Sequence, residues 1–175
     1  MRTLKLQMNI ALDNKWDRGM SDFSIGNLEH VDCILHGRKT AEGFIPYWTD
    51  VANNPNDGEH KLGKRFSEIQ NVIFSNTLSE SKWNNTTILG GNIKKTIQDL
   101  KNQPGKDIIV YGGDSFVASL VEHDLIDEYY LFINPAAIGG EQPVFNPLKN
   151  ASRLTPINCK AFDCGAALVS YSRAK

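Results

Sequence analysis

The sequence predicts an α/β fold with a mostly parallel central sheet and an antiparallel edge, and three features indicate this class. Apolar runs of strand length alternate with runs of helix length over most of the chain. Two of the apolar runs are continuous, as in strands covered on both faces, and end at glycine. Near the C-terminus two strand-like runs follow one another without a helix between them, which favours an antiparallel hairpin at the sheet edge.

The first part of the chain predicts a strand, a helix and a second strand. In residues 4–12, large apolar residues alternate with polar or small ones, which is the period of a strand with one buried face. A short helix is expected over residues 22–29. Residues 31–35 form an apolar run that predicts a buried strand, and Gly37 ends it.

A second helix and a loop are expected before the third strand. Residues 38–45 have a helix-like composition, and Pro46 should stop this helix because proline lacks the backbone N–H. Residues 50–58 are rich in Asn, Asp and Pro, so they predict an exposed loop. The short apolar run at 71–74 predicts the third strand.

The elements alternate further until the last two. Residues 86–89 predict a strand, and the helix after it carries Ile93, Ile97 and Leu100 on one face. The elements expected next are, in order, a central strand at 108–111, an amphipathic helix of about three turns from 114 or 115, a strand at 126–133, and a hairpin formed by 153–162 and 166–172.

Length, charge and composition limit the classes of function. The 175 residues suit one domain, 1–175, and a net charge of −1 without charge blocks argues against a nucleic-acid or anionic-membrane partner. No apolar run approaches the length of a signal peptide or a membrane span. Three cysteines cannot form a closed disulfide set, and reduced thiols are expected. We therefore expect a cytoplasmic protein whose partner is a small molecule or another protein.

The clearest candidate site is the strand end at 108–111 with the pair Gly112-Gly113 and a helix that opens at Asp114 or Ser115. Glycines let a phosphate group approach the backbone, and the helix N-terminus favours negative charge. These are the properties of a dinucleotide site, here without a G-x-G-x-x-G motif. The alternative is a tight strand-to-helix turn in which Asp114 is the N-cap.

Two further strand ends carry polar groups of the same kind. After Gly37, Arg38 offers a planar donor fork, Lys39 a point charge and Thr40 a hydroxyl, a combination that suits a phosphate. The alternative is a surface charge pair with Thr40 as an N-cap. Ser75 and Asn76 follow the strand at 71–74. Carboxyl edges of open α/β sheets are where ligands bind.

Other chemistries find little support in the sequence. The segment 90–92 copies the Gly-Gly arrangement, but we expect its Asn92 to be a plain N-cap outside the site. No G-x-S-x-G, H-E-x-x-H or P-loop motif occurs, and the four histidines are scattered without ligand spacing. We expect no metal site.

Together these segments resemble the dihydrofolate-reductase-like superfamily, in the branch that shares the reductase domain of bacterial riboflavin biosynthesis. The similarity covers most of the chain in the same order. Its segments are 4–13, 37–40, 71–76, 107–116, 125–135, 139–140 and 143–145. The resemblance implies a three-layer fold with a mostly parallel mixed sheet, antiparallel C-terminal edge strands and helices on both faces.

The resemblance also implies an NADPH site and commonly a homodimer. Arg38 with Ser75 and Asn76 would hold the 2′-phosphate of the cofactor. The pyrophosphate would lie between Lys39 and Thr40 on one side and the segment Gly112, Gly113, Asp114, Ser115 and Phe116 on the other. The nicotinamide would lie near Ala11, between the opening strand and Tyr111-Gly112. Hydride would pass from its C4 to a C=N or C=O carbon of a heterocyclic substrate.

The departures from the family lie where the substrate should bind. Relatives often read Ser-Leu-Asp-Gly after the first strand, whereas this chain has Ala-Leu-Asp-Asn at 11–14 and a shortened segment before Gly37. Asp22 lies near the position of a substrate-binding carboxylate in folate-reducing relatives, so it is the candidate proton donor or ring anchor. The alternative is a solvated helix N-cap. Trp16 and Trp48 could line a ring-binding pocket, or pack in the core or lid.

The leading hypothesis is an NADPH-dependent reductase of a pteridine, pyrimidine or related heterocycle. The family-level activity is 5-amino-6-(5-phosphoribosylamino)uracil reduction in riboflavin biosynthesis. This specific substrate is not expected, because the chain shows neither an attached deaminase domain nor an evident second phosphate-binding cluster near the lid. One alternative is a non-catalytic NADPH-binding protein of the same fold with a shortened lid. Another is a flavodoxin-like module, which would bind FMN and be yellow.

Overall fold

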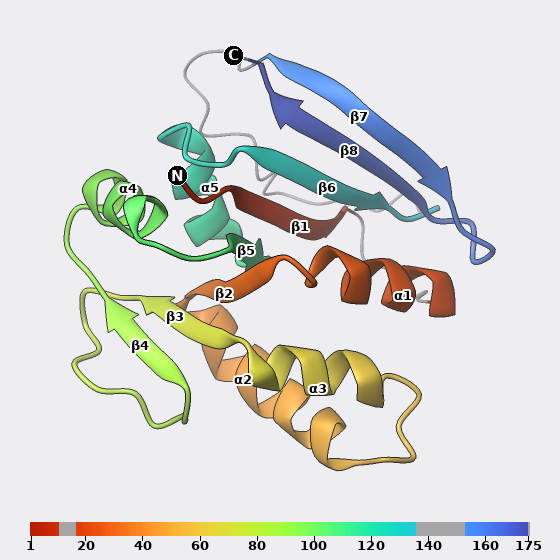
Figure 1. Ribbon diagram of the computed structural model, residues 1–175, viewed down its shortest axis with the longest axis horizontal. Helices are drawn as coiled ribbons and strands as arrows, with labels where there is room; N and C mark the ends of the chain where they lie inside the picture. Colours follow the sequence, from red (N-terminus) through yellow and green to blue (C-terminus); the bar gives the residue numbers. More distant parts are fainter. Residues whose placement is uncertain (11–16, 136–152, 175) are drawn as a thin grey trace.

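A computed structural model describes residues 1–10, 17–135 and 153–174 of the chain, and its centre is one eight-stranded sheet (Figure 1). The strand order is β4-β3-β2-β5-β1-β6-β8-β7. The strands are β1 (Leu4–Ile10), β2 (Val31–Gly37), β3 (Gln70–Phe74), β4 (Thr86–Leu89), β5 (Asp107–Tyr111), β6 (Glu128–Ile133), β7 (Leu154–Ala161) and β8 (Ala167–Arg173).

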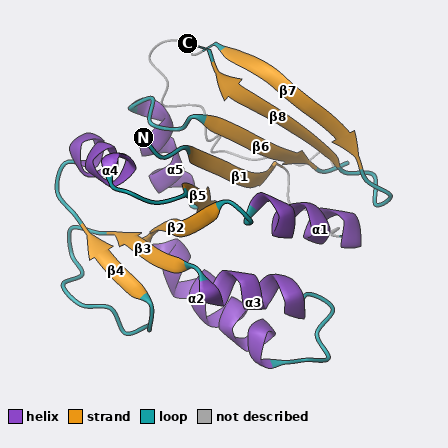
Figure 2. Cartoon of the chain, in the orientation of Figure 1, coloured by secondary structure: helices purple, strands orange, loops and turns teal. Residues whose placement is uncertain are grey.

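Helices cover both faces of this sheet, which gives three layers (Figure 2). They are α1 (Arg18–Asn27), α2 (Arg38–Asn53), α3 (His60–Glu68), α4 (Ile93–Asn102) and α5 (Asp114–Glu122). Apolar residues of α4 and α5 pack on one face, and those of α1, α2 and α3 pack on the other. The predicted three-layer α/β fold is confirmed.

The predicted mostly parallel sheet with an antiparallel C-terminal edge is confirmed. The neighbours from β4 to β6 pair in parallel, whereas β8 pairs antiparallel with both β6 and β7. Hence the carboxyl ends of the six parallel strands lie at one edge of the sheet. The β7–β8 hairpin, which turns around Gly165, forms the antiparallel border.

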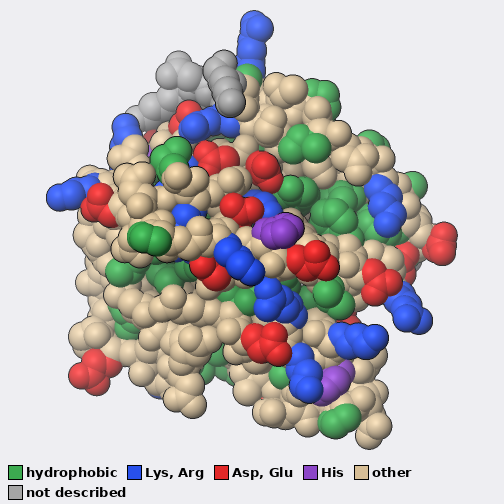
Figure 3. Space-filling view, in the orientation of Figure 1, with side chains coloured by type: hydrophobic (Ala, Val, Ile, Leu, Met, Phe, Trp, Pro, Cys, Tyr) green, Lys and Arg blue, Asp and Glu red, His purple; other side chains and the backbone are tan. Residues whose placement is uncertain are grey.

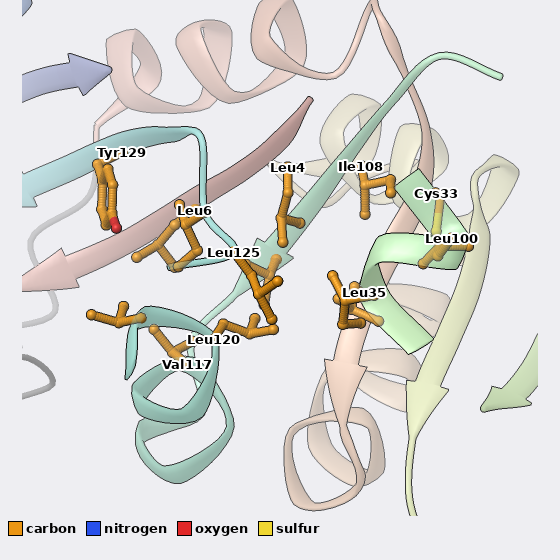
Figure 4. Packing of buried hydrophobic residues seen from close by; sticks show 14 of the residues in the cluster. Leu4, Leu6, Cys33, Leu35, Leu100, Ile108, Val117, Leu120, Leu125 and Tyr129 are labelled. Carbon is orange, nitrogen blue, oxygen red and sulfur yellow. The ribbon is translucent and has the colours of Figure 1, made fainter. Parts of the chain in front are cut away.

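The larger core lies between the sheet and the helices α4 and α5. Leu4 and Leu6 of β1 contribute fully buried side chains, and Val117 and Leu120 of α5 pack against this layer (Figure 4). The thiol of Cys33 lies in the same core, where burial raises its pKa to about 12. Apolar burial of this kind is worth about 1.5–3 kcal/mol per large side chain, so it anchors β1 at the centre of the sheet.

The prediction that Pro46 stops the second helix is wrong, because α2 continues through Pro46 to Asn53. Proline removes the hydrogen bond to the carbonyl of Glu42, but both residues are exposed, so water can reach the free carbonyl. Ala41, Ile45 and Val51 are buried on either side of the proline and hold the helix against the sheet. The expected loop at 50–58 is accordingly shorter and begins after Asn53.

One other helix prediction needs correction, and one helix was missed. The first helix begins at Arg18 rather than near 22, because the carboxylate of Asp17 accepts a hydrogen bond from the Met20 N–H at 2.9 Å and caps it. The helix α3 was not predicted at all. Its Gly63 packs so closely on α2 that a Cβ atom there would lie 2.7 Å from the Cγ1 of Val51. This tight α2–α3 contact explains a glycine inside a helix.

The surface in Figure 3 agrees with the expectation that charges of both signs are mixed along the chain. Acidic and basic side chains are interspersed on the face in Figure 3, without a field of one sign. Among the described helices, none is both long and apolar enough to span a membrane.

His36 gives β2 a pH-dependent contribution to stability. Its ring is fully buried, and Nε2 donates to the Oδ1 of Asn71 at 2.8 Å. Burial lowers the pKa of His36 from 6.5 to about 4, so the folded protein keeps the ring neutral where the unfolded chain would protonate it. This contribution is therefore complete above pH 6.5 and is lost as the pH falls through that value toward 4.

We expect His36→Gln to remove this pH dependence. The free energy of unfolding of the parent protein should fall by about 3 kcal/mol more than that of the variant between pH 7 and pH 4. Urea unfolding of both proteins at several pH values measures the difference. Parallel curves for the two proteins would show that His36 does not titrate as a buried neutral group.

Candidate functional site

The carboxyl edge of the sheet has a topological switch point between β2 and β5. These strands are parallel neighbours, but α2 leads away to β3 on one side, whereas α5 leads to β6 on the other. The two helices pack on opposite faces, so their N-termini begin side by side at the strand ends. Ligands of open α/β sheets bind in the crevice at such a point.

Two close contacts fix the helix starts around this crevice. A Cβ atom at Gly37 would lie 2.8 Å from the Cβ of Phe116, so glycine lets β2 approach α5. Gly113 has φ of +83°, and a Cβ there would run into the Oγ1 of Thr40. The end of each strand therefore touches the first turn of the other strand's helix, and only glycine permits this distance.

The crevice is a groove of about 710 Å³, and residues from the first turns of α2 and α5 line it. The N-caps of α2 and α5 are Gly37 and Gly113, and neither has a side chain that bonds the first-turn N–H groups. By contrast, Asn92 caps α4 by accepting from the Lys95 N–H at 3.0 Å, as predicted. Because no N-cap side chain bonds them, the first-turn N–H groups and the dipoles of α2 and α5 make the groove suited to an anion such as a pyrophosphate.

Most of the predicted cofactor residues line this one groove. Its lining comprises Gly37, Arg38, Lys39, Thr40, Phe74, Ile93, Gly113, Asp114, Ser115, Phe116 and Ser119. The rings of Phe74 and Phe116 stack with their centroids 5.7 Å apart. The Nη1 of Arg38 donates to the Oε1 of Glu42 at 2.8 Å, so a ligand phosphate would compete with this carboxylate.

Neither Thr40 nor Asp114 is the N-cap of its helix. Asp114 is the first residue of α5, and Thr40 lies in the first turn of α2, so both alternative readings as N-caps are wrong. Glycine takes the cap positions because the neighbouring helix lies too close for a side chain. The exposed Asp114 leaves a negative charge at the margin of the groove.

Ser75 and Asn76 lie beyond the groove lining, which reaches β3 only at Phe74. The hydroxyl of Ser75 accepts from the Thr77 and Leu78 N–H groups, and the Oδ1 of Asn76 accepts from the Gly91 N–H at 2.6 Å. Both side chains thus stabilise local turns in this structure.

A second cavity, of about 260 Å³, includes Tyr111 at the end of β5, two residues before Gly113 of the groove. It is lined by Gln7, Met8, Asn9, Ser24, Phe44, Trp48, Glu59, Leu62, Phe66, Tyr111 and Phe132. The rings of Phe44 and Tyr111 are stacked 5.5 Å apart, and those of Trp48 and Phe66 lie 4.6 Å apart. An apolar, aromatic wall with a few polar groups is typical of a site for a planar ring.

The polar groups of the cavity are mostly uncharged and held in place. Gln7 is buried, and its Nε2 donates to the Oγ of Ser24 at 2.8 Å while its Oε1 accepts from Asn27 at 2.9 Å. The Oδ1 of Asn9 and the hydroxyl of Tyr111 are buried without a hydrogen-bond partner in the described parts of the chain. Burial also raises the pKa of Tyr111, so its hydroxyl stays protonated.

The structure places the predicted substrate residues unequally. Trp48 lines the cavity. Asp22 does not: its side chain is 67% exposed and lies 3.9 Å from Arg18, so the carboxylate that a proton donor requires does not face the cavity. It also lies inside α1 and is not its N-cap. The predicted contacts of Ala11 and Trp16 fall outside the described residues.

Apart from Trp48, the aromatic and apolar residues of the cavity were not predicted from the sequence. Phe44 and Trp48 are four residues apart, as are Leu62 and Phe66, which puts each pair on one helix face. That spacing could have identified both pairs. Gln7 could not have been found in this way, because a polar residue of an alternating strand normally faces solvent.

The family follows from the comparison with known proteins. The model of the RibD C-terminal domain family matches residues 16–168. The chain belongs to the RibD C-terminal domain family. This confirms the resemblance to the riboflavin-biosynthesis reductase branch.

Relatives of this RibD C-terminal domain occur in Bacillus subtilis. The uncharacterized protein YyaP is 32% identical over 155 residues, which cover 89% of this chain and 79% of that protein. The uncharacterized protein YwjB is 24% identical over 162 residues, which cover 93% and 83%.

Solved structures show the same fold at low identity. A pyrimidine reductase-like protein of Corynebacterium diphtheriae superposes with a TM-score of 0.66 and 14% identity, over 99% of this chain and 92% of that chain. A diaminohydroxyphosphoribosylaminopyrimidine deaminase/5-amino-6-(5-phosphoribosylamino)uracil reductase of Thermotoga maritima gives 0.69 and 13%. It matches 99% of this chain but 57% of the longer protein.

The Gly37–Phe116 contact can be tested with a matched pair of substitutions in one segment. We expect Gly37→Ala to destabilise the domain by about 1–3 kcal/mol, because the new methyl group overlaps Phe116. Gly43→Ala, inside the helix α2 that Gly37 precedes, has no atom within 4 Å of the new Cβ and should stabilise by about 0.5–1 kcal/mol. Chemical unfolding measures both. Equal effects of the two substitutions would contradict the close approach.

Proposed function

We propose that this RibD C-terminal domain is an NADPH-dependent reductase of a small heterocyclic substrate. The observation that carries the proposal is the junction of two sites at one strand end. Gly113 lines a groove at two helix N-termini that have no capping side chain, and Tyr111, two residues earlier, lines an aromatic cavity. A dinucleotide that follows the groove would present its ring at the entrance of the cavity.

The residues of the groove fit the phosphates of the cofactor. The N–H groups of the first turns of α2 and α5 would bind the pyrophosphate, and Lys39 and Thr40 line the same groove. Arg38 would hold the 2′-phosphate after exchanging its Glu42 partner. Ser75 and Asn76 lie nearby, and we propose that they join Arg38 only if their turn rearranges. When bound, NADPH would supply the hydride.

The residues of the cavity would orient the substrate and exclude water. Phe44 and Trp48 offer partly exposed ring faces to a planar heterocycle. Gln7 and Ser24 are fixed by their mutual hydrogen bond, so they can read polar ring atoms without a large loss of entropy. Family membership supports the reductase class, and the substrate itself is part of the proposal. A homodimer also remains a proposal, which a mass measurement in solution would test.

A titration with NADPH, NADH and FMN, followed by turnover assays, tests the function. We expect NADPH to bind most tightly, and its absorbance to fall when a pteridine or pyrimidine substrate is added. NADPH binding without oxidation across such a panel would support the non-catalytic alternative. Preferential binding of FMN would contradict the proposal.

Arg38→Ala tests the cofactor preference. We expect it to weaken NADPH binding about 10- to 100-fold and NADH binding much less, because a charge-assisted contact to the 2′-phosphate is lost. Arg18→Ala is the matched control, since Arg18 also pairs with a carboxylate four residues on but lies outside the groove. An equal loss for both cofactors in Arg38→Ala would contradict this role.

A further inference from the structure

The aromatic cavity carries negative charge at its mouth. Glu59 is half-buried, lines the cavity, and accepts a hydrogen bond from the Oγ of Ser21 at 3.0 Å. Its position is fixed further by its N–H, which donates to the Oδ1 of Asp57 at 2.8 Å. A fixed carboxylate beside aromatic rings attracts cations and repels phosphates.

The surface beside Glu59 also carries net negative charge. A neighbouring pocket shares Glu59 and Leu62 with the cavity, and its lining also includes Asp17, Asp22 and Asp57. Arg18 and Lys61 provide the opposing charges there, so four carboxylates face two permanent cations. An anionic substrate would cross this field before it reached the rings.

The aromatic wall completes a cation site. Phe44 and Trp48 are half-buried with centroids 6.0 Å apart, and Phe66 and Tyr111 back them at 5.0 and 5.5 Å from Phe44. The negative faces of such rings attract a delocalised cation, most strongly where water is excluded.

We propose that the cavity selects a planar, cationic ring that carries no phosphate group. The proposal rests on the reductase function and names its substrate class. Glu59 supplies the counter-charge, and Phe44 and Trp48 supply the ring faces. The Oδ1 of Asn9 and the hydroxyl of Tyr111, both buried and without partners in the described chain, offer one acceptor and one donor to the polar edge of the ring.

This charge suits the chemistry of the site. For a ring with a C=N⁺ group, bound NADPH would supply hydride to the carbon and become NADP⁺, and the π-electron pair of the C=N⁺ bond would become the lone pair of a neutral amine. The step is balanced without a proton donor. This fits a cavity in which Asp22, the predicted donor, faces solvent.

Binding of three related ligands to the cofactor-free protein tests the proposal without requiring turnover. Calorimetric titrations at pH 8 would use N-methylquinolinium as the cation, quinoline as the neutral ring and quinoline-carboxylate as the anion. We expect the cation to bind at least about fivefold more tightly than the neutral ring, and the anion to bind most weakly.

Two variants identify the groups that carry the preference. Glu59→Gln keeps the hydrogen-bond acceptor for Ser21 but removes the charge, so the preference for the cation should fall about five- to tenfold. Glu122→Gln, on the exposed side of α5, makes the same chemical change away from the cavity and should leave it unaltered. Trp48→Leu should weaken the cation more than the neutral ring.

The outcomes separate this proposal from the reductase function. Equal or tighter binding of the neutral or anionic ring would overturn it, as would an unchanged preference in Glu59→Gln. Addition of NADPH and N-methyl-3,4-dihydroisoquinolinium then reports on turnover. Cation binding that depends on Glu59 but gives no loss of NADPH absorbance would support the cation site and contradict the reductase function. Oxidation of NADPH by a phosphorylated pyrimidine, and by no cationic ring, would support the reductase function and contradict the cation site.

Discussion

The close approach between the ends of β2 and β5 is the constraint on which the rest of the site depends. Gly37 touches Phe116, and Gly113 touches Thr40, so each strand end contacts the first turn of the other strand's helix. Because α2 and α5 then pass to opposite faces of the sheet, their N-termini stay together at its carboxyl edge. The switch in chain direction thus becomes a groove, and the glycines keep its backbone open to a ligand.

Of the three glycine turns that precede α2, α4 and α5, those before α2 and α5 form the anion-binding end of the groove, and helix capping explains the difference. The turn before α4 has the same pair of glycines, but there the side chain of Asn92 accepts a hydrogen bond from the Lys95 N–H. At α2 and α5 the close packing leaves no room for a capping side chain, so their N–H groups remain available. Because no capping side chain fits, the first-turn N–H groups can bind an anionic ligand. In other dinucleotide folds a longer glycine motif has this effect.

The cavity owes its character to the second helical layer. α2 and α3 pack as a tight pair through Gly63, and this brings Phe44, Trp48 and Phe66 together over the face of the sheet. Gln7 faces this layer from β1, where it bonds Ser24 of α1. The cavity is aromatic on one wall and amide-rich on the other because helices cover the polar positions of a strand that would otherwise face solvent.

The sequence by itself determined the fold class, the strand order along the chain and the two glycine turns, because these follow from hydrophobic period and local backbone freedom. It also determined Asn92 as a cap, since a cap acts within three residues. Only the tertiary structure decided that α2 passes through Pro46, because buried neighbours outweigh one missing hydrogen bond. It likewise decided that Asp22 faces solvent while Gln7, Ser24 and Glu59 face the cavity. Those directions depend on how α1 and α3 pack on the sheet, which no local pattern specifies.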